Sequence, residues 1–217
     1  MKLLYSYHEF LGAVGRAIDA DEAYGVARPA SRDRRGPRPW VGMCMVSSID
    51  GSTVVDGNSL ALSGPADRNV LLALRRHADT VMVGAGTVRD EGYGKPSKPN
   101  QRVAIISRSG NVDTSSELFT SGAGYLVTPG SSGNVDLFDA VAAMRGSYVQ
   151  LEGGAQLNAA MCEADLVDEI NLTLSPNIVG GSGPRLTTGA RDMLQRYVLH
   201  HVLEDDGFVF LRYVRAD

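Results

Sequence analysis

Two stretches of the sequence place glycines directly after a short apolar run. Gly84-Ala85-Gly86-Thr87 follows Thr80-Val81-Met82-Val83, and Glu152-Gly153-Gly154 follows Tyr148-Val149-Gln150-Leu151. Such runs of strong β-formers indicate buried strands whose backbone bends tightly, or lets a ligand approach closely, at the carboxyl end. Open α/β sheets bind ligands at that end, and glycine amides beside a helix N-terminus can cradle a phosphate. The two turns therefore predict one shared crevice.

Polar side chains also follow other expected strands. Ser107-Arg108-Ser109 follows a third apolar run and could offer hydroxyls and a guanidinium to a phosphate monoester, such as the 2′-phosphate of NADPH. Asp50, in Ser48-Ile49-Asp50-Gly51, either caps a turn with Gly51 or binds or protonates a substrate. Glu152 poses the same choice, and its place before two glycines favours a carboxylate that faces a ligand.

Other site classes are weakly supported. Gly84-x-Gly86 lacks the third glycine of a dinucleotide fingerprint, and the run 180–184 lacks the Gly-Lys-Ser/Thr ending of a Walker loop. None of the four histidines lies in the pattern of a catalytic pair, so a serine or cysteine hydrolase is not indicated. Cys44 and Cys162 form no C-x-x-C pair, so we expect buried free thiols and predict no metal site.

The composition favours a small-molecule ligand. A chain of 217 residues suffices for one large domain or two small ones with a packed core. The balance of 21 basic against 25 acidic residues gives a net charge of −4, which argues against nucleic-acid and anionic-membrane partners because both require a basic face. We find no signal-peptide pattern and no apolar stretch that approaches the ~18 residues of a membrane span. We therefore expect a soluble protein of the reducing cytoplasm.

Repeated strand and helix patterns must position these candidate residues. They predict the α/β class, with a mixed, mostly parallel sheet, helices on both faces and a C-terminal antiparallel hairpin. Residues 1–39 are expected to form an N-terminal arm with a short helix over 7–18 and an exposed Arg- and Pro-rich linker over 28–39; the main domain spans 40–217. Strands are expected over 40–48, 80–83, 103–106, 125–127, 148–151, 169–174, 197–203 and 208–214, helices over 65–77, 136–144 and 156–164, and an irregular loop over 89–100.

With these residues identified, the chain resembles the reductase domain of the bifunctional deaminase-reductases of riboflavin biosynthesis, and the related stand-alone pyrimidine reductases. The resemblance spans about residues 40–186 and depends on a combination of motifs in the order of that family. These motifs are Ser48-Ile49-Asp50-Gly51, Leu62-Ser63-Gly64 through Arg68 and Leu74-Arg75, Asp79 to Thr87, Leu151-Glu152-Gly153-Gly154, and Leu166-Val167-Asp168-Glu169.

The resemblance implies a dihydrofolate-reductase-like fold, usually in a homodimer. The implied reaction uses NADPH to reduce the ribosyl group of 5-amino-6-(5-phosphoribosylamino)uracil, or of its 2,5-diamino pyrimidinone precursor, to ribityl. Asp50 is then a candidate for promoting sugar ring opening or delivering a proton. The residues implied against NADPH are Val46, Ala61, Gly84, Gly86, Thr87, Glu91, Ser107, Arg108, Gly153, Gly154, Ala155, Gln156 and Leu157. Those implied against the substrate are Ser59, Arg75, Lys95, Lys98 and Glu152, of which the three basic residues would hold the 5′-phosphate.

The chain departs from the family pattern at three points. The stretch 89–95 replaces the usual A-D-N-P-x-L-T-x-R loop, and Ala61 stands where many members carry Trp. The H-x-E and P-C-x-x-C motifs of the zinc deaminase half are absent, which indicates a reductase only. Two alternatives stay open on the same fold: a dihydrofolate or other pterin reductase, and a non-catalytic nucleotide-binding protein.

Overall fold

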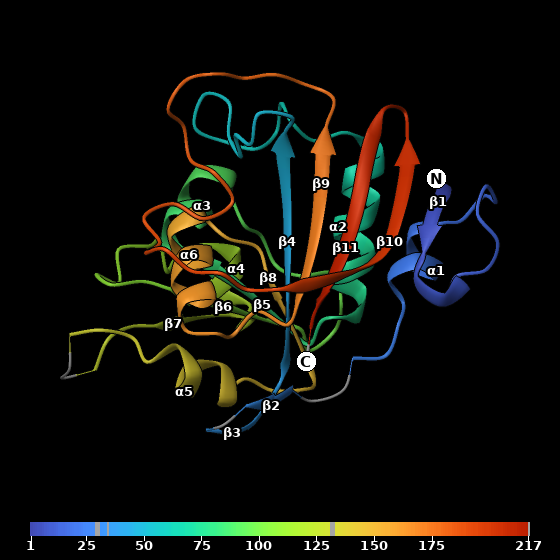
Figure 1. Ribbon diagram of the computed structural model, residues 1–217. Coiled ribbons are helices and arrows are strands. Elements are labelled where there is room, and N and C mark those ends of the chain that lie inside the picture. The colour runs from blue at the N-terminus through green and yellow to red at the C-terminus, as the bar shows by residue number, and fades with distance from the viewer. Residues whose placement is uncertain (29–30, 34, 131–132, 217) are drawn as a thin grey trace.

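A nine-stranded sheet with helices on both faces forms the centre of the protein (Figure 1). The computed structural model describes residues 1–28, 31–33, 35–130 and 133–216. The strand order is β1-β10-β11-β9-β4-β8-β5-β6-β7, and a separate two-stranded sheet pairs β2 with β3. The strands are β1 (Lys2–Ser6), β2 (Ser31–Asp33), β3 (Gly36–Arg38), β4 (Trp40–Ser48), β5 (Thr80–Gly84), β6 (Arg102–Ile106), β7 (Gly124–Val127), β8 (Tyr148–Leu151), β9 (Glu169–Ser175), β10 (Tyr197–Asp205) and β11 (Phe208–Arg215). The helices are a 3₁₀ turn η1 (Tyr7–Glu9), α1 (Ala20–Tyr24), α2 (Pro65–His77), α3 (Ala85–Glu91), α4 (Glu117–Thr120), α5 (Leu137–Ala142) and α6 (Ala155–Glu163).

The sheet is mixed and mostly parallel. Five neighbouring pairs, from β9 through β4, β8, β5 and β6 to β7, are parallel, whereas β1, β10, β11 and β9 pair antiparallel. The hairpin β10–β11 turns at Asp206 and Gly207, which both have positive φ, as a two-residue hairpin loop requires. These features confirm the predicted fold class.

Alternating side chains of the central strands supply a core on each face of the sheet. Met43 of β4 and Met82 of β5 pack with α5 and α6, whereas Cys44 and Trp40 pack on the other face with α1 and α2. Val81 and its neighbours on β5 and β6 pack with α3 and α4. This alternation is that of strands with one core on each face.

The N-terminal segment differs from the prediction. The helix expected over 7–18 is not formed; β1 instead pairs with β10 at the edge of the sheet, and a five-residue helix, α1, packs near α2. The prediction of an exposed linker over 28–39 is wrong at Arg28 and Arg38, whose exposed fractions are 8% and 4%. Residues 29, 30 and 34 lie outside the described residues, and the division into an arm and a main domain stays a prediction.

The arginines are buried because they pair with carboxylates far along the chain. Arg28 donates to both oxygens of Glu169, and Arg38 donates to both oxygens of Asp168. Both carboxylates stand where the chain enters β9. The composition of the segment suggested solvent exposure, but a paired arginine can be buried.

Among the described residues, no helix has the length and apolar character needed to cross a membrane. The same part of the chain holds no group of three or more His, Cys, Asp and Glu side chains suited to a metal ion.

Candidate active site

The two glycine turns lie against each other at the carboxyl ends of β5 and β8. The Gly84 N–H donates to the Gly153 carbonyl at 2.6 Å, and the Glu152 N–H donates to the Met82 carbonyl at 2.9 Å. A Cβ on Gly154 would lie 2.9 Å from Thr87 Oγ1, which is closer than real Cβ contacts come. A side chain at position 154 would displace Thr87, so glycine permits this approach. The two turns are in contact, and a shared ligand site stays a prediction.

Gly84 ends β5 and is also the N-cap of α3, so the predicted turn is the first turn of a helix. This corrects the expectation of an irregular loop from residue 89, because α3 continues to Glu91. Gly92 then ends the helix in the left-handed conformation, with φ of 67°, and reverses the chain. The irregular segment is limited to residues 93–101.

Glu152 is the centre of a buried hydrogen-bonded cluster. Its two carboxylate oxygens accept from Arg75 Nε at 2.7 Å and Nη2 at 2.6 Å, and Oε2 also accepts from the Tyr93 hydroxyl at 2.6 Å. The Glu152 side chain is 4% exposed and that of Arg75 is 33% exposed. Burial and the adjacent Glu152 carboxylate raise the pKa of Tyr93 well above its usual value, so the hydroxyl keeps its proton. Glu152 is thus held from the direction of α2 and from the segment after α3.

Asp50 accepts three hydrogen bonds where the chain leaves β4. The donors are the Ser48 hydroxyl at 2.5 Å, the Val179 N–H at 3.2 Å and the Gly180 N–H at 2.6 Å. These bonds, that from Ser48 first, lower the pKa of Asp50 to about 2. Asp50 is therefore ionised at neutral pH and joins the loop after β4 to the loop after β9. These contacts differ from the expected cap of the turn at Gly51, because both backbone donors lie on the loop after β9, and a catalytic role stays a prediction.

Ser59 and Glu91, expected on the substrate and cofactor sides, contact each other. The Ser59 hydroxyl and N–H both donate to Glu91 Oε1, at 2.7 and 3.3 Å. The bond connects the loop after β4 to the last turn of α3. The two loops above β4 and β9 in Figure 1 are also joined, because the Thr53 N–H donates to the Pro184 carbonyl at 3.0 Å.

The two lysines expected at the substrate phosphate, Lys95 and Lys98, make no hydrogen bond or ion pair with the Glu152 cluster in the described part of the chain. The Lys98 ammonium donates to the Ala78 carbonyl at 2.8 Å and lies 3.8 Å from Asp79, both of which precede β5. The glycine turn lies at the other end of that strand. Lys95 is exposed in the segment 93–101. Their role toward a phosphate stays a prediction, and the geometry gives Lys98 a structural contact.

The remaining expected cofactor residues lie around the carboxyl ends of the parallel strands. Ser107 is buried at the end of β6, where its hydroxyl accepts from the Gly110 N–H at 2.9 Å, and Arg108 beside it is exposed. Val46 is buried near the end of β4, whereas Ala61 is exposed in the loop that follows. Ala155, Gln156 and Leu157 form the first turn of α6, directly after Gly154.

Comparison with known proteins gives the family. Residues 39–207 match the family described as the RibD C-terminal domain. The chain belongs to this family. The match confirms the resemblance predicted from the motifs between residues 40 and 186.

Individual members and neighbours agree with this assignment. The chain is 26% identical to the 2,5-diamino-6-ribosylamino-4(3H)-pyrimidinone 5′-phosphate reductase of Methanothermobacter thermautotrophicus over 181 residues, which cover 68% of this chain and 82% of that protein. Its fold is similar to a pyrimidine reductase-like protein from Corynebacterium diphtheriae, with a TM-score of 0.76, 23% identity and coverage of 92% and 100% of the two chains. It is also similar to the dihydrofolate reductase of Enterococcus faecalis, with a TM-score of 0.56, 14% identity and coverage of 82% and 97%. The dihydrofolate-reductase-like fold is therefore established.

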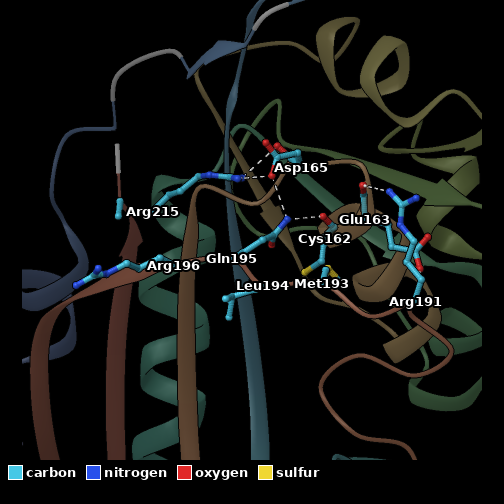
Figure 2. A pocket seen from close by; sticks show the side chains of 10 residues that line it. Cys162, Glu163, Asp165, Arg191, Met193, Leu194, Gln195, Arg196 and Arg215 are labelled. Atoms are coloured by element: carbon cyan, nitrogen blue, oxygen red, sulfur yellow. Dashed lines mark hydrogen bonds and ion pairs between the residues drawn. The ribbon is translucent and has the colours of Figure 1, made fainter.

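A separate cavity of about 430 Å³ lies beside the C-terminal end of helix α6 (Figure 2). None of the expected site residues lines it. Figure 2 shows Gln195 and Arg215 turned toward Asp165, and both side chains donate to that carboxylate. The Arg191 N–H donates to Glu163 at 2.6 Å. The carboxylates of Asp165 and Glu163 thus have partners within this cavity.

Tyr93 is the site residue that sequence reasoning missed. It lies in the stretch 89–95, where the sequence departs from the family pattern. A glycine followed by an aromatic residue just after a short helix was the available signal. That signal did not identify Glu152 as the partner, because the two residues are 59 positions apart.

Proposed function

We propose that the protein is an NADPH-dependent pyrimidine reductase of riboflavin biosynthesis. It reduces the ribosyl group of 5-amino-6-(5-phosphoribosylamino)uracil, or of the 2,5-diamino pyrimidinone, to ribityl. The observation that carries the proposal is the contact between the two glycine turns at adjacent strand ends, with the buried Glu152–Arg75 pair beside them. Membership of the RibD C-terminal domain family and the name of the Methanothermobacter relative support the substrate class.

The residues around the turns fit a nicotinamide dinucleotide. A Cβ on Gly86 would meet only Arg89 Nη2, at 3.8 Å, so there is space beside the first turn of α3. Gly154 is the N-cap of the nine-residue helix α6, whose first N–H groups have no partner within the helix. The buried Asn158 Oδ1 has no hydrogen-bond partner in the described part of the chain. Free backbone N–H groups at the N-terminus of a helix suit a diphosphate.

The cofactor contacts are proposed from the family resemblance, and the contact between the two glycine turns supports them. Gly84, Gly153 and Gly154 let the backbone approach the cofactor, and Thr87 lines the same turn. The other proposed contacts are Val46, Ala61, Gly86, Glu91, Ser107, Arg108, Ala155, Gln156 and Leu157. When bound, the reduced nicotinamide supplies the hydride for the reduction.

The protein's own contribution is orientation and exclusion of water. Glu152 and Arg75 hold each other, so each presents a fixed edge to the substrate. Ser59, Lys95 and Lys98 complete the proposed substrate contacts. Asp50, as a carboxylate, stays a candidate for promoting opening of the sugar ring by accepting a proton.

Cofactor oxidation with defined substrates tests the proposal. Purified protein should oxidise NADPH with one of the two phosphoribosylamino-pyrimidines and not with dihydrofolate. Activity with dihydrofolate alone would identify a pterin reductase. NADPH binding without turnover of any pyrimidine or pterin would identify a non-catalytic protein.

Arg108→Ala tests the cofactor preference. We expect it to weaken NADPH binding more than NADH binding, because Arg108 is proposed to contact the 2′-phosphate. Equal loss for both cofactors would contradict this role.

We also propose that the protein is a homodimer. Size-exclusion chromatography with light scattering would measure the mass of the particle and so the number of copies in it.

A further inference from the structure

The chain brings Tyr93 to the buried Glu152 by a specific route. Gly92 ends α3 in the left-handed conformation, and Tyr93 then packs against the core cluster that includes Val81 and Val83. Its hydroxyl donates to Glu152 Oε2, the same oxygen that accepts from Arg75 Nη2. The guanidinium carbon of Arg75 lies 5.3 Å from the centre of the Tyr93 ring. Tyr93 therefore contacts both members of the ion pair.

The Arg75 guanidinium has one edge occupied and one edge free. Nε and Nη2 donate to Glu152, and Nη1 makes no hydrogen bond within the described part of the chain. The free Nη1–Nη2 edge is a fork of two parallel donors, which matches two oxygens of a phosphate. Because Arg75 is 33% exposed and Glu152 only 4%, the free edge belongs to the accessible member of the pair.

The opposite charges of Glu152 and Arg75 determine how the pair could bind a phosphate. Glu152 offsets the positive charge of Arg75, so the pair attracts a phosphate less through net charge than through the direction of its donors. The direction of the Arg75 donors depends on how firmly the Glu152 carboxylate is held in place. Among the described residues, Arg75 and Tyr93 donate to the Glu152 carboxylate, and of these only Tyr93 lies outside the ion pair.

We propose that Tyr93 is a positioning residue for substrate phosphate: by holding Glu152, it fixes the free edge of Arg75 toward the phosphate monoester of the substrate. The inference rests on the proposed function, because it takes the phosphorylated pyrimidine as the ligand. It also assigns a function to the stretch 89–95, where the chain departs from its family. The departure replaces loop residues with an aromatic side chain that acts through Arg75.

Tyr93→Phe removes the hydroxyl and keeps the ring. We expect KM for the phosphorylated pyrimidine to rise about tenfold, the effect of losing one hydrogen bond to a charged group, with kcat changed by less than about twofold. KM for the same pyrimidine without its phosphate should not change. A purely structural role would alter both substrates equally, and that result, or no change in either KM, would overturn the proposal.

Tyr125→Phe is a matched control. Tyr125 also packs against an arginine, with Arg102 4.9 Å from its ring centre, and its hydroxyl has no hydrogen-bond partner among the described residues. This variant should leave KM unchanged for both substrates. In an Arg75→Lys background, Tyr93→Phe should have no further effect on KM, because lysine has no fork to orient. A full tenfold effect in that background would show that Tyr93 acts without Arg75 and would overturn the proposal.

Failure of the proposed function is distinguishable from failure of this inference. If the wild-type protein reduces no pyrimidine, the proposed function fails, and calorimetry with ribose 5-phosphate decides the role of Tyr93. Wild-type binding that weakens about tenfold in Tyr93→Phe, and not in Tyr125→Phe, would support that role. Absence of ribose 5-phosphate binding, or equal binding by all three proteins, would overturn it.

Discussion

Replacement of Arg28 by methionine should destabilise the whole protein, because it removes a buried guanidinium that joins the N-terminal segment to the sheet. Arg28 donates to Glu169 at 2.8 and 3.1 Å and to the carbonyls of Tyr24 and Val26 at 3.0 and 3.1 Å. Its guanidinium also lies 4.2 Å from the centre of the Tyr148 ring. Methionine keeps much of the aliphatic stem and loses all of these polar contacts.

The expected loss follows from what remains around Glu169. Breaking a buried ion pair by removing one partner costs about 3–5 kcal/mol. Glu169 would still accept from Arg212 at 3.0 Å, Trp40 Nε1 at 3.2 Å and Asn171 at 3.0 Å, so its charge stays compensated. We therefore expect the lower end, about 3 kcal/mol, which is a large share of the ~5–15 kcal/mol typical of a folded domain.

Urea unfolding followed by circular dichroism measures this loss. The control is Arg16→Met, which removes the partner of Glu22 in an ion pair whose two side chains are 34% and 50% exposed. That variant should lose less than about 1 kcal/mol. If Arg28→Met were no more destabilising than Arg16→Met, the segment would not be part of the cooperative unit, and the reasoning would be refuted.

Three further changes test other parts of the structure. Burial, reinforced by Arg212, lowers the pKa of His201 to about 3. Between about pH 6.5 and pH 5 this side chain is therefore protonated in the unfolded chain but not in the folded one, so the free energy of unfolding should fall by roughly 2 kcal/mol between pH 7 and pH 5. Urea unfolding of His201→Phe at the two pH values should lack that part of the fall. Gly154→Ala should lower the melting temperature because its Cβ would lie 2.9 Å from Thr87 Oγ1, and Thr87→Ala in the same chain should restore part of the loss; an unchanged melting temperature in the single variant would contradict this contact. Asp50→Asn should reduce kcat if the carboxylate promotes ring opening, whereas full kcat in a normally folded variant would show that Asp50 only joins the loops after β4 and β9.

The sequence was enough to predict those structural features whose residues all lie close together along the chain. The apolar runs before Gly84 and Gly153 were enough to predict both strands and their turns, because strand propensity and glycine need only a few residues to be recognised. The same holds for the Asp206-Gly207 hairpin. Features made of distant partners were not predictable: Arg28 is 141 positions from Glu169, and Tyr93 is 59 from Glu152. The expected helix over 7–18 does not form because Gly12 and Gly15 both have positive φ, and the chain that follows hydrogen-bonds to β1, where the Leu3 N–H donates to the Arg16 carbonyl.

The order of the strands explains why the site forms at Gly84 and Gly153. β8 lies between β4 and β5, although it follows both in the chain. The chain leaves β5 into α3, whose Val88 packs with Val81, and leaves β8 into α6, whose Leu157 packs with the core on the opposite face. The helices after adjacent strands therefore diverge to opposite sides of the sheet, which is the arrangement at which open α/β sheets bind ligands. Because neither helix covers the point of divergence, the two turns must contact each other directly there, and glycine is what permits the contact. The same divergence leaves Glu152 without helix α6 above it, so the segment after α3 can reach it with Tyr93.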